Sequence, residues 1–376
     1  MIGPYKAGKE GRITYKGNKI FSPLNDIRVM RINPHTIGDR VNSIHDDDMY
    51  SHISKINDTI NSSTVNYFSE LGALFIPLPL TTRMISPPGA VYGRGKINCT
   101  TDTCPITLDW FDLSKKAFLS ESSQIYLELA LLQTNINHVF ANYNSFRKEK
   151  ADATHLSEFH HIEYEGKVNQ NRNLEIAGGL LKRIVKDLTS RNVSDLMYFV
   201  NEKSVAELNS MLGKTIPIVT LKDALDLLYK STHDEKYKEF TLKNFNAWEE
   251  IKLTELVGGI VGVSEMPLLE VPFYHAKKDG SEVLAADNCD IILPGYRETI
   301  GSGHRVRSTS ELEEKAVLFN LPREDYEPYL QSRRFADYEE TSGFGLGWER
   351  FLQGLLEMPF VYSASLFPRI DSILKP

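Results

Sequence analysis

The amino-acid sequence predicts an α+β fold. Segments with the apolar spacing of helices and short apolar segments typical of strands follow each other without regular alternation, which favours α+β over a doubly wound parallel sheet. The chain has 376 residues, enough for one large domain or two of ordinary size. Its 41% hydrophobic and 25% charged residues are typical of a globular protein with a substantial core.

The first part of the chain contains an arm, a helix and an edge strand. Residues 1–42 are polar and rich in turn-forming residues, so we assign them to an N-terminal arm. From Met49 to Leu71 apolar residues recur at helical spacing, and Gly72 ends this predicted helix. Residues 74–80 form an apolar segment whose prolines suit an edge strand. Residues 81–107 carry many Gly, Pro and Thr residues and are expected to form a loop.

Residues 43–376 are expected to form one domain, with a mainly helical insertion over about 185–265. A break at Ser190–Asn192 is expected to interrupt the first helix of this region. The remaining predicted elements are strands over 117–119, 138–140, 157–164 and 288–293, helices that end near residue 133 and that span 175–211 and 310–319, and a strand that becomes a helix over 343–354.

Charge and cysteine content narrow the classes of function. The net charge of −7 argues against extended contact with a nucleic-acid backbone, although a local basic patch is compatible with it. Cys99, Cys104 and Cys289 are too few for a disulfide framework and indicate a reducing compartment. The first two are better explained as loop cysteines than as half of a zinc site, because no second pair is present. Since no signal peptide or bilayer-spanning apolar run is evident, the cytoplasm is the expected location.

The most specific signal lies near the C-terminal end. In Ser342-Gly343-Phe344-Gly345-Leu346-Gly347-Trp348-Glu349-Arg350, glycine at every second position leaves one strand face bare, so that a flat ligand can lie against the backbone. A glycine-rich strand without a ligand is the alternative. The segment resembles motif 3 of the class II aminoacyl-tRNA synthetases, in the variant of the aspartyl, asparaginyl and lysyl branch, and Phe367-Pro368-Arg369 resembles a later motif of that branch. The resemblance implies that Gly347 lies in the ATP site and that Arg350 binds the γ-phosphate.

A second segment resembles motif 2 of the same family. Phe146-Arg147-Lys148-Glu149 precedes a polar loop, and the strand that follows begins with His155-Leu156-Ser157-Glu158-Phe159. An arginine offers a planar fork to a phosphate on which charge develops, and an aromatic ring stacks on adenine. The resemblance therefore implies that Arg147 binds the α-phosphate and that Phe159 stacks on the base. It also puts Glu149 and His155 in the ATP site. Alternatively, the charges after Phe146 are surface charges on a hairpin.

A third segment, residues 285–305, supplies the candidate metal ligands. It resembles the family strand and turn whose glutamate holds Mg²⁺ on the triphosphate, a role for carboxylate oxygens because Mg²⁺ is a hard cation. The resemblance gives this role to Glu298, with Asp290 as a second candidate, and it makes Arg305 the contact to the side-chain end of the amino acid. The alternative is that both carboxylates are structural groups of a solvated loop.

The segment around Gln124 distinguishes between amino-acid substrates. In aspartyl enzymes of the family, a lysine stands where this chain has Leu127, whereas asparaginyl enzymes lack it and have a glutamate at the position of Glu128. A carboxylate accepts from an amide NH₂ and an arginine donates to the amide oxygen, so Glu128 with Arg305 is expected to bind a carboxamide, with Gln124 nearby. The same glutamate would repel an aspartate side chain. Alternatively, Glu128 is a surface residue of an amphipathic helix.

Some residues depart from the family pattern. The arginine that precedes the histidine–leucine pair is Thr154, so one triphosphate contact is missing. A glycine–glycine–serine sequence is Gly301-Ser302-Gly303, so the serine associated with Mg²⁺ has moved. The family fold implied is an antiparallel β-sheet flanked by helices. About forty residues precede the first predicted helix, too few for the five-stranded OB-fold that binds the anticodon in asparaginyl enzymes, so no OB-fold domain is expected.

Together the motifs predict an ATP- and Mg²⁺-dependent ligase that activates asparagine or a close analogue as an aminoacyl-adenylate, with Arg147 and Arg350 as the catalytic residues. The expected acceptor is an amine, ammonia or a tRNA 3′ end, and ordinary anticodon-dependent tRNA charging is not favoured. Alternatives are an ammonia-dependent asparagine synthetase acting on aspartate, a tRNA-acylating paralogue, and a non-catalytic binding or regulatory protein. A homodimer is expected, because the helix before Gly72 and the later Pro79 resemble the dimer-forming motif 1.

Overall fold

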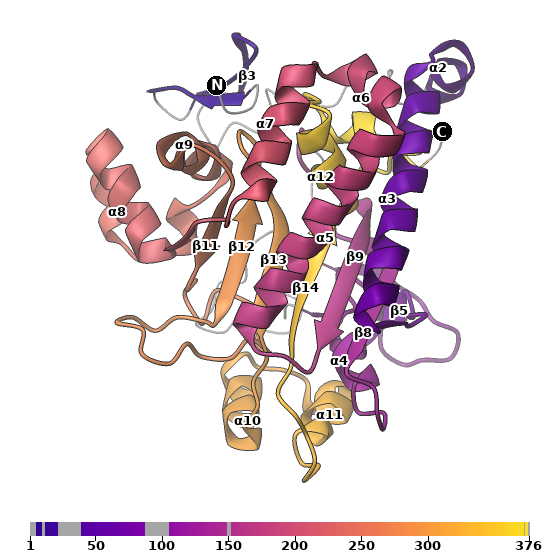
Figure 1. The fold of residues 1–376 in the computed structure, drawn as a ribbon. Helices are drawn as coiled ribbons and strands as arrows, with labels where there is room; N and C mark the ends of the chain where they lie inside the picture. Colours follow the sequence, from indigo (N-terminus) through magenta and orange to yellow (C-terminus); the bar gives the residue numbers. More distant parts are fainter. Residues whose placement is uncertain are drawn as a thin grey trace.

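The computed structural model describes residues 5–9, 12–21, 39–86, 105–148, 152–371 and 373–374. The predictions for Glu149, Cys99 and Cys104 fall outside these residues. Helices and strands are mixed as the sequence predicted, and the predicted α+β class is confirmed (Figure 1).

An eight-stranded sheet forms the centre of the fold, in the order β10-β11-β12-β13-β14-β9-β8-β4. Its neighbouring strands are antiparallel except at the two edges, where β10 pairs with β11 and β4 pairs with β8 in parallel. The strands are β4 (Leu74–Phe75), β8 (His138–Phe146), β9 (Glu158–Gly166), β10 (Ile218–Thr220), β11 (Val261–Ser264), β12 (Asn288–Ile292), β13 (Glu298–His304) and β14 (Ser342–Gly347).

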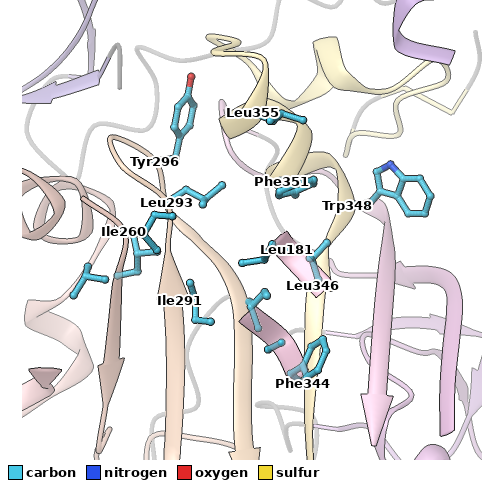
Figure 2. Packing of buried hydrophobic residues seen from close by; sticks show 14 of the residues in the cluster. Leu181, Ile260, Ile291, Leu293, Tyr296, Phe344, Leu346, Trp348, Phe351 and Leu355 are labelled. Atoms are coloured by element: carbon cyan, nitrogen blue, oxygen red, sulfur yellow. The ribbon is translucent and has the colours of Figure 1, made fainter. Parts of the chain in front are cut away.

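Two long helices, α3 (Met49–Leu71) and α5 (Gln170–Arg191), lie along one face of this sheet (Figure 1). The α3 bounds confirm the predicted helix, and Gly72 ends it in the left-handed conformation with φ of 78°. Glycine adopts this conformation without the steric penalty of a side chain. Figure 2 shows Phe344 and Leu346 of β14 on the side of the sheet where Leu181 of α5 packs, within one buried apolar cluster.

Side-chain alternation makes the opposite face of the sheet polar and open. Leu346 pairs with Ile162 of β9 and Ile300 of β13, and all three are buried in the core. The next row, Glu163, Gly345, Gly301 and Asp290 on β9, β14, β13 and β12, therefore faces away from α5. The sheet register thus brings two carboxylates and two glycines from distant segments into one line, on the face where the site is built.

The remaining helices surround the sheet, and they include most of the predicted insertion. The predicted break at Ser190–Asn192 is confirmed, because α5 ends at Arg191 and α6 begins at Val193. The insertion is not only helical, since it also contributes β10 and β11 to the main sheet. The other helices are α2 (Arg40–Asp46), α4 (Gln124–Ala130), α6 (Val193–Phe199), α7 (Glu202–Gly213), α8 (Leu221–Thr232), α9 (Ala247–Val257), α10 (Thr309–Leu318), α11 (Arg323–Ser332) and α12 (Trp348–Leu355), with 3₁₀ turns η4 (Glu235–Lys238), η5 (Leu242–Asn244) and η6 (Val361–Ala364).

Two small sheets complete the fold. In the N-terminal arm, β1 (Tyr5–Ala7), β2 (Ile13–Tyr15) and β3 (Asn18–Phe21) form an antiparallel sheet. This sheet packs on the core, because the Tyr5 hydroxyl donates to the Pro359 carbonyl at 2.6 Å and the Trp248 indole donates to the Gly8 carbonyl at 3.0 Å. The second sheet has the order β5-β7-β6 and consists of β5 (Thr81–Thr82), β6 (Ile106–Leu108) and β7 (Ala117–Leu119).

The segment predicted as a loop over 81–107 therefore begins and ends in a strand. In the part of the chain that the structure describes, none of the helices combines the length and apolar character needed to cross a membrane.

Candidate active site

Two joined cavities, of about 330 Å³ and about 130 Å³, lie on the open face of the sheet. Arg147, His161, Glu298 and Gly345 line both of them. A cation, a neutral ring, a carboxylate and a bare backbone position therefore meet where the cavities join. A ligand that extends from one cavity to the other would pass beside the Arg147 guanidinium.

The smaller cavity contains the residues predicted for ATP. The Arg147 guanidinium lies 5.1 Å from the centre of the Phe159 ring, a cation–π contact that fixes the two side chains relative to each other. Its Nε atom is buried without a hydrogen-bond partner among the described residues. His155 and Gly347 also line this cavity. The predicted phosphate ligand, ring and glycine thus lie around one space.

Arg350 closes one side of the smaller cavity from the first turn of α12. Its guanidinium donates to the carbonyl oxygen of Glu298 at 2.9 Å and to that of Thr154 at 3.4 Å. The Glu298 carboxylate lies 3.9 Å from Nη1 of Arg350 as well and offsets part of the arginine charge. Arg350 lines the smaller cavity, where it can contact an anionic ligand, although burial lowers its pKa from the ordinary arginine value.

The sequence interpretation missed Arg297, which lies where Thr154 left a contact unfilled. Its Nη1 atom is 3.5 Å from the Thr154 hydroxyl and 3.0 Å from Nε2 of His155, although it comes from the turn before β13. Glu250 of α9 orients the guanidinium through contacts of 3.2 and 3.3 Å. The sequence does show an arginine directly before the candidate metal ligand Glu298. Only the fold, however, brings this arginine next to Thr154.

Carboxylates gather beside Arg297. Asp290 lies on β12, and its pKa is raised well above the usual range by burial and by the nearby charges of Glu298 and Glu250. No cluster of three or more metal-binding side chains occurs among the residues whose placement is described. Mg²⁺ commonly binds through one or two carboxylates together with waters and substrate phosphates, so Asp290 and Glu298 fit this ion with a nucleotide present.

A buried ion pair forms the end of the larger cavity. Arg305 donates to both carboxylate oxygens of Glu165, at 3.0 and 2.9 Å, and the pair is almost fully enclosed. Gln124 adds a third bond to Glu165 at 2.5 Å and also donates to the Tyr164 carbonyl at 2.7 Å. The predicted amino-acid residues Arg305 and Gln124 are therefore together in this cavity, and the arginine charge already has a partner.

Glu163 is a second carboxylate of this cavity that the sequence interpretation did not single out. It accepts hydrogen bonds from the Ser122 hydroxyl at 2.7 Å and from the Tyr143 hydroxyl at 2.5 Å. Burial raises its pKa to about 7, so the proton is in balance near neutrality. Strand alternation from Phe159 predicts that it faces the ligand, but that signal does not separate it from its neighbours.

Glu128 lies apart from these residues and lines neither cavity. Its carboxylate is buried against α11, where it forms an ion pair with Arg333 and accepts from the Tyr329 hydroxyl at 2.6 Å and from Tyr338 at 3.1 Å. The partner of Arg305 is Glu165 instead. The expected pairing of Glu128 with Arg305 is thus not formed, because Arg333 takes up the Glu128 carboxylate and Glu165 takes up the Arg305 guanidinium.

The neighbouring residues His160 and His161 face opposite ways, as strand alternation predicts. His161 lines both cavities, and burial together with Arg147 and Arg350 holds its pKa well below the usual range. It is therefore a neutral ring, held at 2.8 Å by the Ser145 hydroxyl. The Nδ1 atom of His160 contacts Glu349 at 2.6 Å instead.

The comparisons with known proteins agree with this arrangement. The family model described as tRNA synthetases class II (D, K and N) matches residues 38–371. The chain is 26% identical over 326 residues to the asparagine–tRNA ligase of Rhodopirellula baltica, and the match covers 84% of this chain and 66% of that protein. It is 31% identical over 274 residues to the asparagine–tRNA ligase of Thermococcus gammatolerans, and this match covers 72% of this chain and 60% of that protein. The chain thus spans slightly less than two thirds of these relatives.

Among solved structures, asparaginyl-tRNA synthetase from Pyrococcus horikoshii complexed with asparaginyl-adenylate matches with a TM-score of 0.78 at 24% identity. The match covers 100% of this chain and 83% of that chain. At this level of identity the likeness establishes a shared fold.

Proposed function

Because the chain belongs to the class II tRNA synthetase family of the D, K and N type, we propose that it is an AMP-forming ligase. It would activate the carboxylate of asparagine or a close analogue with ATP and pass the acyl group to an acceptor. The observation that carries the proposal is the junction of the two cavities at Arg147, where a carboxylate in the larger one could attack an α-phosphate held by the smaller one.

In this proposal the chain acts by positioning and by charge. Arg147 stabilises the charge that develops on the α-phosphate, and Phe159 stacks on adenine over the backbone at Gly347. Arg350 of α12 and Arg297 of the turn before β13 bind the outer phosphates of ATP. No base is needed for the attack, because the substrate carboxylate is already ionised at neutral pH.

Mg²⁺ is the proposed metal, bound by Glu298 with Asp290. When bound with ATP, it would neutralise charge on the phosphate oxygens. The fit rests on the positions of the two carboxylates: both line the larger cavity beside Gly301, where an added Cβ would lie 2.7 Å from Oε1 of Glu298 and 3.7 Å from Oδ1 of Asp290. Glu250 is less suited to the role, since it already pairs with Arg297.

Asparagine is favoured over aspartate by the charges of the larger cavity. The Arg305 charge is matched by Glu165 in a buried pair, so a substrate carboxylate at Arg305 would find that charge already neutralised. A carboxamide needs none: its oxygen can accept from Arg305 while its NH₂ donates to Glu163. We therefore propose Glu163 in the role that the sequence had suggested for Glu128. The same charges argue against an ammonia-dependent synthetase acting on aspartate.

The acceptor that we propose to test first is the 3′ end of a tRNA. The relatives from Rhodopirellula baltica and Thermococcus gammatolerans are named asparagine–tRNA ligases, and this naming is a reason to test tRNA before an amine or ammonia. The expectation against tRNA charging has no such support. Incubation with ATP, labelled asparagine and total tRNA would give acid-precipitable label if tRNA is the acceptor. If none of the labelled asparagine becomes attached to tRNA, or if it is found only on small amines, tRNA is not the acceptor.

A non-catalytic role is the alternative from another class. The departures from the family pattern at Thr154 and Gly303 favour this role, but Arg297 supplies a cation next to Thr154. AMP formation on incubation with ATP and asparagine separates the two possibilities. A protein that binds asparagine yet forms no adenylate and no AMP would be the binding protein.

We also propose that the chain forms a homodimer through the edge of the sheet at β4. Leu74 and Phe75 are 51% and 56% exposed on this short strand, directly after α3. Exposed apolar side chains on an edge strand favour pairing with another surface. Light scattering on the purified protein should give twice the chain mass, and Phe75→Lys should lower that mass to one chain.

A further inference from the structure

Gly303 of β13 makes room for a buried histidine in the larger cavity. A Cβ atom at this position would overlap the Nδ1 and Cε1 atoms of His275. His275 follows the turn at Pro272, and its backbone forms an isolated antiparallel bridge with Arg305. The position of the ring therefore depends on the absence of a side chain at residue 303.

The order Gly301-Ser302-Gly303 is what leaves this space open. The Ser302 hydroxyl donates to the Cys289 carbonyl at 2.6 Å and accepts from Gln170 of α5 at 2.9 Å, so it is already bonded within the fold. A serine one position later would stand where the His275 ring lies. The altered sequence thus replaces a hydroxyl on the cavity side with an imidazole from another segment.

One ring nitrogen of His275 is buried without a bonding partner. The residue is 8% exposed and lines the larger cavity, and its Nδ1 atom is buried with no hydrogen bond to a residue that the structure describes. Its pKa is held well below the usual range by burial and by the charges of Arg305, Lys315 and His304. A neutral imidazole offers one donor and one acceptor, and an enclosed polar group without a partner is unfavourable until a ligand supplies one.

We propose that His275 is a specificity-determining residue that hydrogen-bonds the side-chain end of the amino-acid substrate beside Arg305. This inference rests on the proposed function and adds to its substrate class. Arg305 and Glu165 cancel each other's charge and the ring adds none, so the site favours a side chain that ends in a neutral polar group. His275 acts on this selection and not on ATP, since its backbone is paired with that of Arg305 at the amino-acid end of the larger cavity.

The test compares His275→Leu, His275→Gln and Gly303→Ala with wild type, with Gly178→Ala as the matched control. Gly178 lies in α5, and a Cβ there would meet nothing within 4 Å. Pyrophosphate exchange gives KM for asparagine and for ATP, and calorimetry gives Kd for asparagine. We expect His275→Leu and Gly303→Ala to raise KM and Kd for asparagine about tenfold, the effect of one lost hydrogen bond. KM for ATP should stay within about twofold, and His275→Gln should recover part of the loss.

The outcomes separate this inference from the proposed function. Asparagine KM and Kd within about twofold of wild type in His275→Leu, or an equal rise in KM for ATP, would overturn the role of His275. If wild type shows no exchange but binds asparagine, the proposed function is refuted, and the loss of that binding in His275→Leu still supports the inference. If wild type neither exchanges nor binds asparagine, both are refuted. Should Gly303→Ala fail to fold, the two His275 variants decide.

Discussion

Gly343 and Gly345 lie on the same face of β14, but we expect substitution by alanine to lower stability at Gly343 and to weaken ATP binding at Gly345. At Gly343, a new Cβ would overlap Oε2 of Glu165 and lie 2.5 Å from Nε2 of Gln124 and from the Tyr164 carbonyl oxygen. The carbonyl belongs to the paired strand and cannot move aside. Overpacking of this kind costs about 1–3 kcal/mol, and displacing Glu165 also weakens a buried ion pair whose disruption costs about 3–5 kcal/mol. We expect Gly343→Ala to lose at least about 3 kcal/mol of unfolding free energy.

At Gly345, a new Cβ would lie 3.4 Å from Glu163, which is close to ordinary contact. Gly345→Ala should therefore change the unfolding free energy by less than about 1 kcal/mol, because a strand position tolerates alanine. The added methyl group would instead stand on the floor shared by both cavities. We expect it to raise KM for ATP about tenfold, since a substrate that lies against the bare backbone would be pushed away.

Urea unfolding followed by tryptophan fluorescence measures the first effect, and pyrophosphate exchange measures the second. Wild type and Gly345→Ala should unfold at similar urea concentrations, with Gly343→Ala clearly lower. Equal stability of the two variants would refute the assignment of Gly343 to a packed position. An unchanged KM for ATP in Gly345→Ala would refute the interpretation of this face as a ligand surface.

Three charged groups of the site give further predictions. Because burial raises the pKa of Glu163 to about 7, its carboxylate becomes a full acceptor only above that pH, and KM for asparagine should fall from about pH 6 to about pH 8. The folded state also holds this proton more tightly than the unfolded state, so urea unfolding should show stability lost as pH rises from the ordinary value of 4.5 toward about 7. Arg297→Ala should raise KM for ATP about tenfold and leave KM for asparagine unchanged, and an unchanged KM for ATP would contradict its role. Glu298→Gln should raise the Mg²⁺ concentration needed for half-maximal exchange, whereas the exposed control Glu324→Gln should not.

Local sequence patterns were sufficient to predict much of the fold. The helix over Met49–Leu71 could be placed to its last residue, because its apolar spacing is regular and Gly72 ends it. The alternating glycines predicted that β14 has one open face, and this face lines the cavities at Gly345 and Gly347. Such features depend on a few neighbouring residues, which a single sequence displays directly.

Features that depend on distant segments could not be predicted. Arg297 and Thr154 are far apart in the sequence, and only the sheet brings them within 3.5 Å. Glu128 matched a family position, but the orientation of α4 and the presence of Arg333 decide where its carboxylate goes. Likewise, the insertion contributes β10 and β11 because the sheet edge accepts them, and the composition of the insertion does not show this.

Pyrophosphate exchange by the purified wild-type protein, with each standard amino acid in turn, is the measurement on which the proposed activity depends. We expect ATP to be labelled from pyrophosphate in the presence of Mg²⁺ and asparagine, with far less label for aspartate. The exchange should be lost in Arg147→Ala, because that guanidinium lies where the two cavities meet. Exchange with none of the standard amino acids by a folded protein, or exchange that persists unchanged in Arg147→Ala, would contradict adenylation at this site.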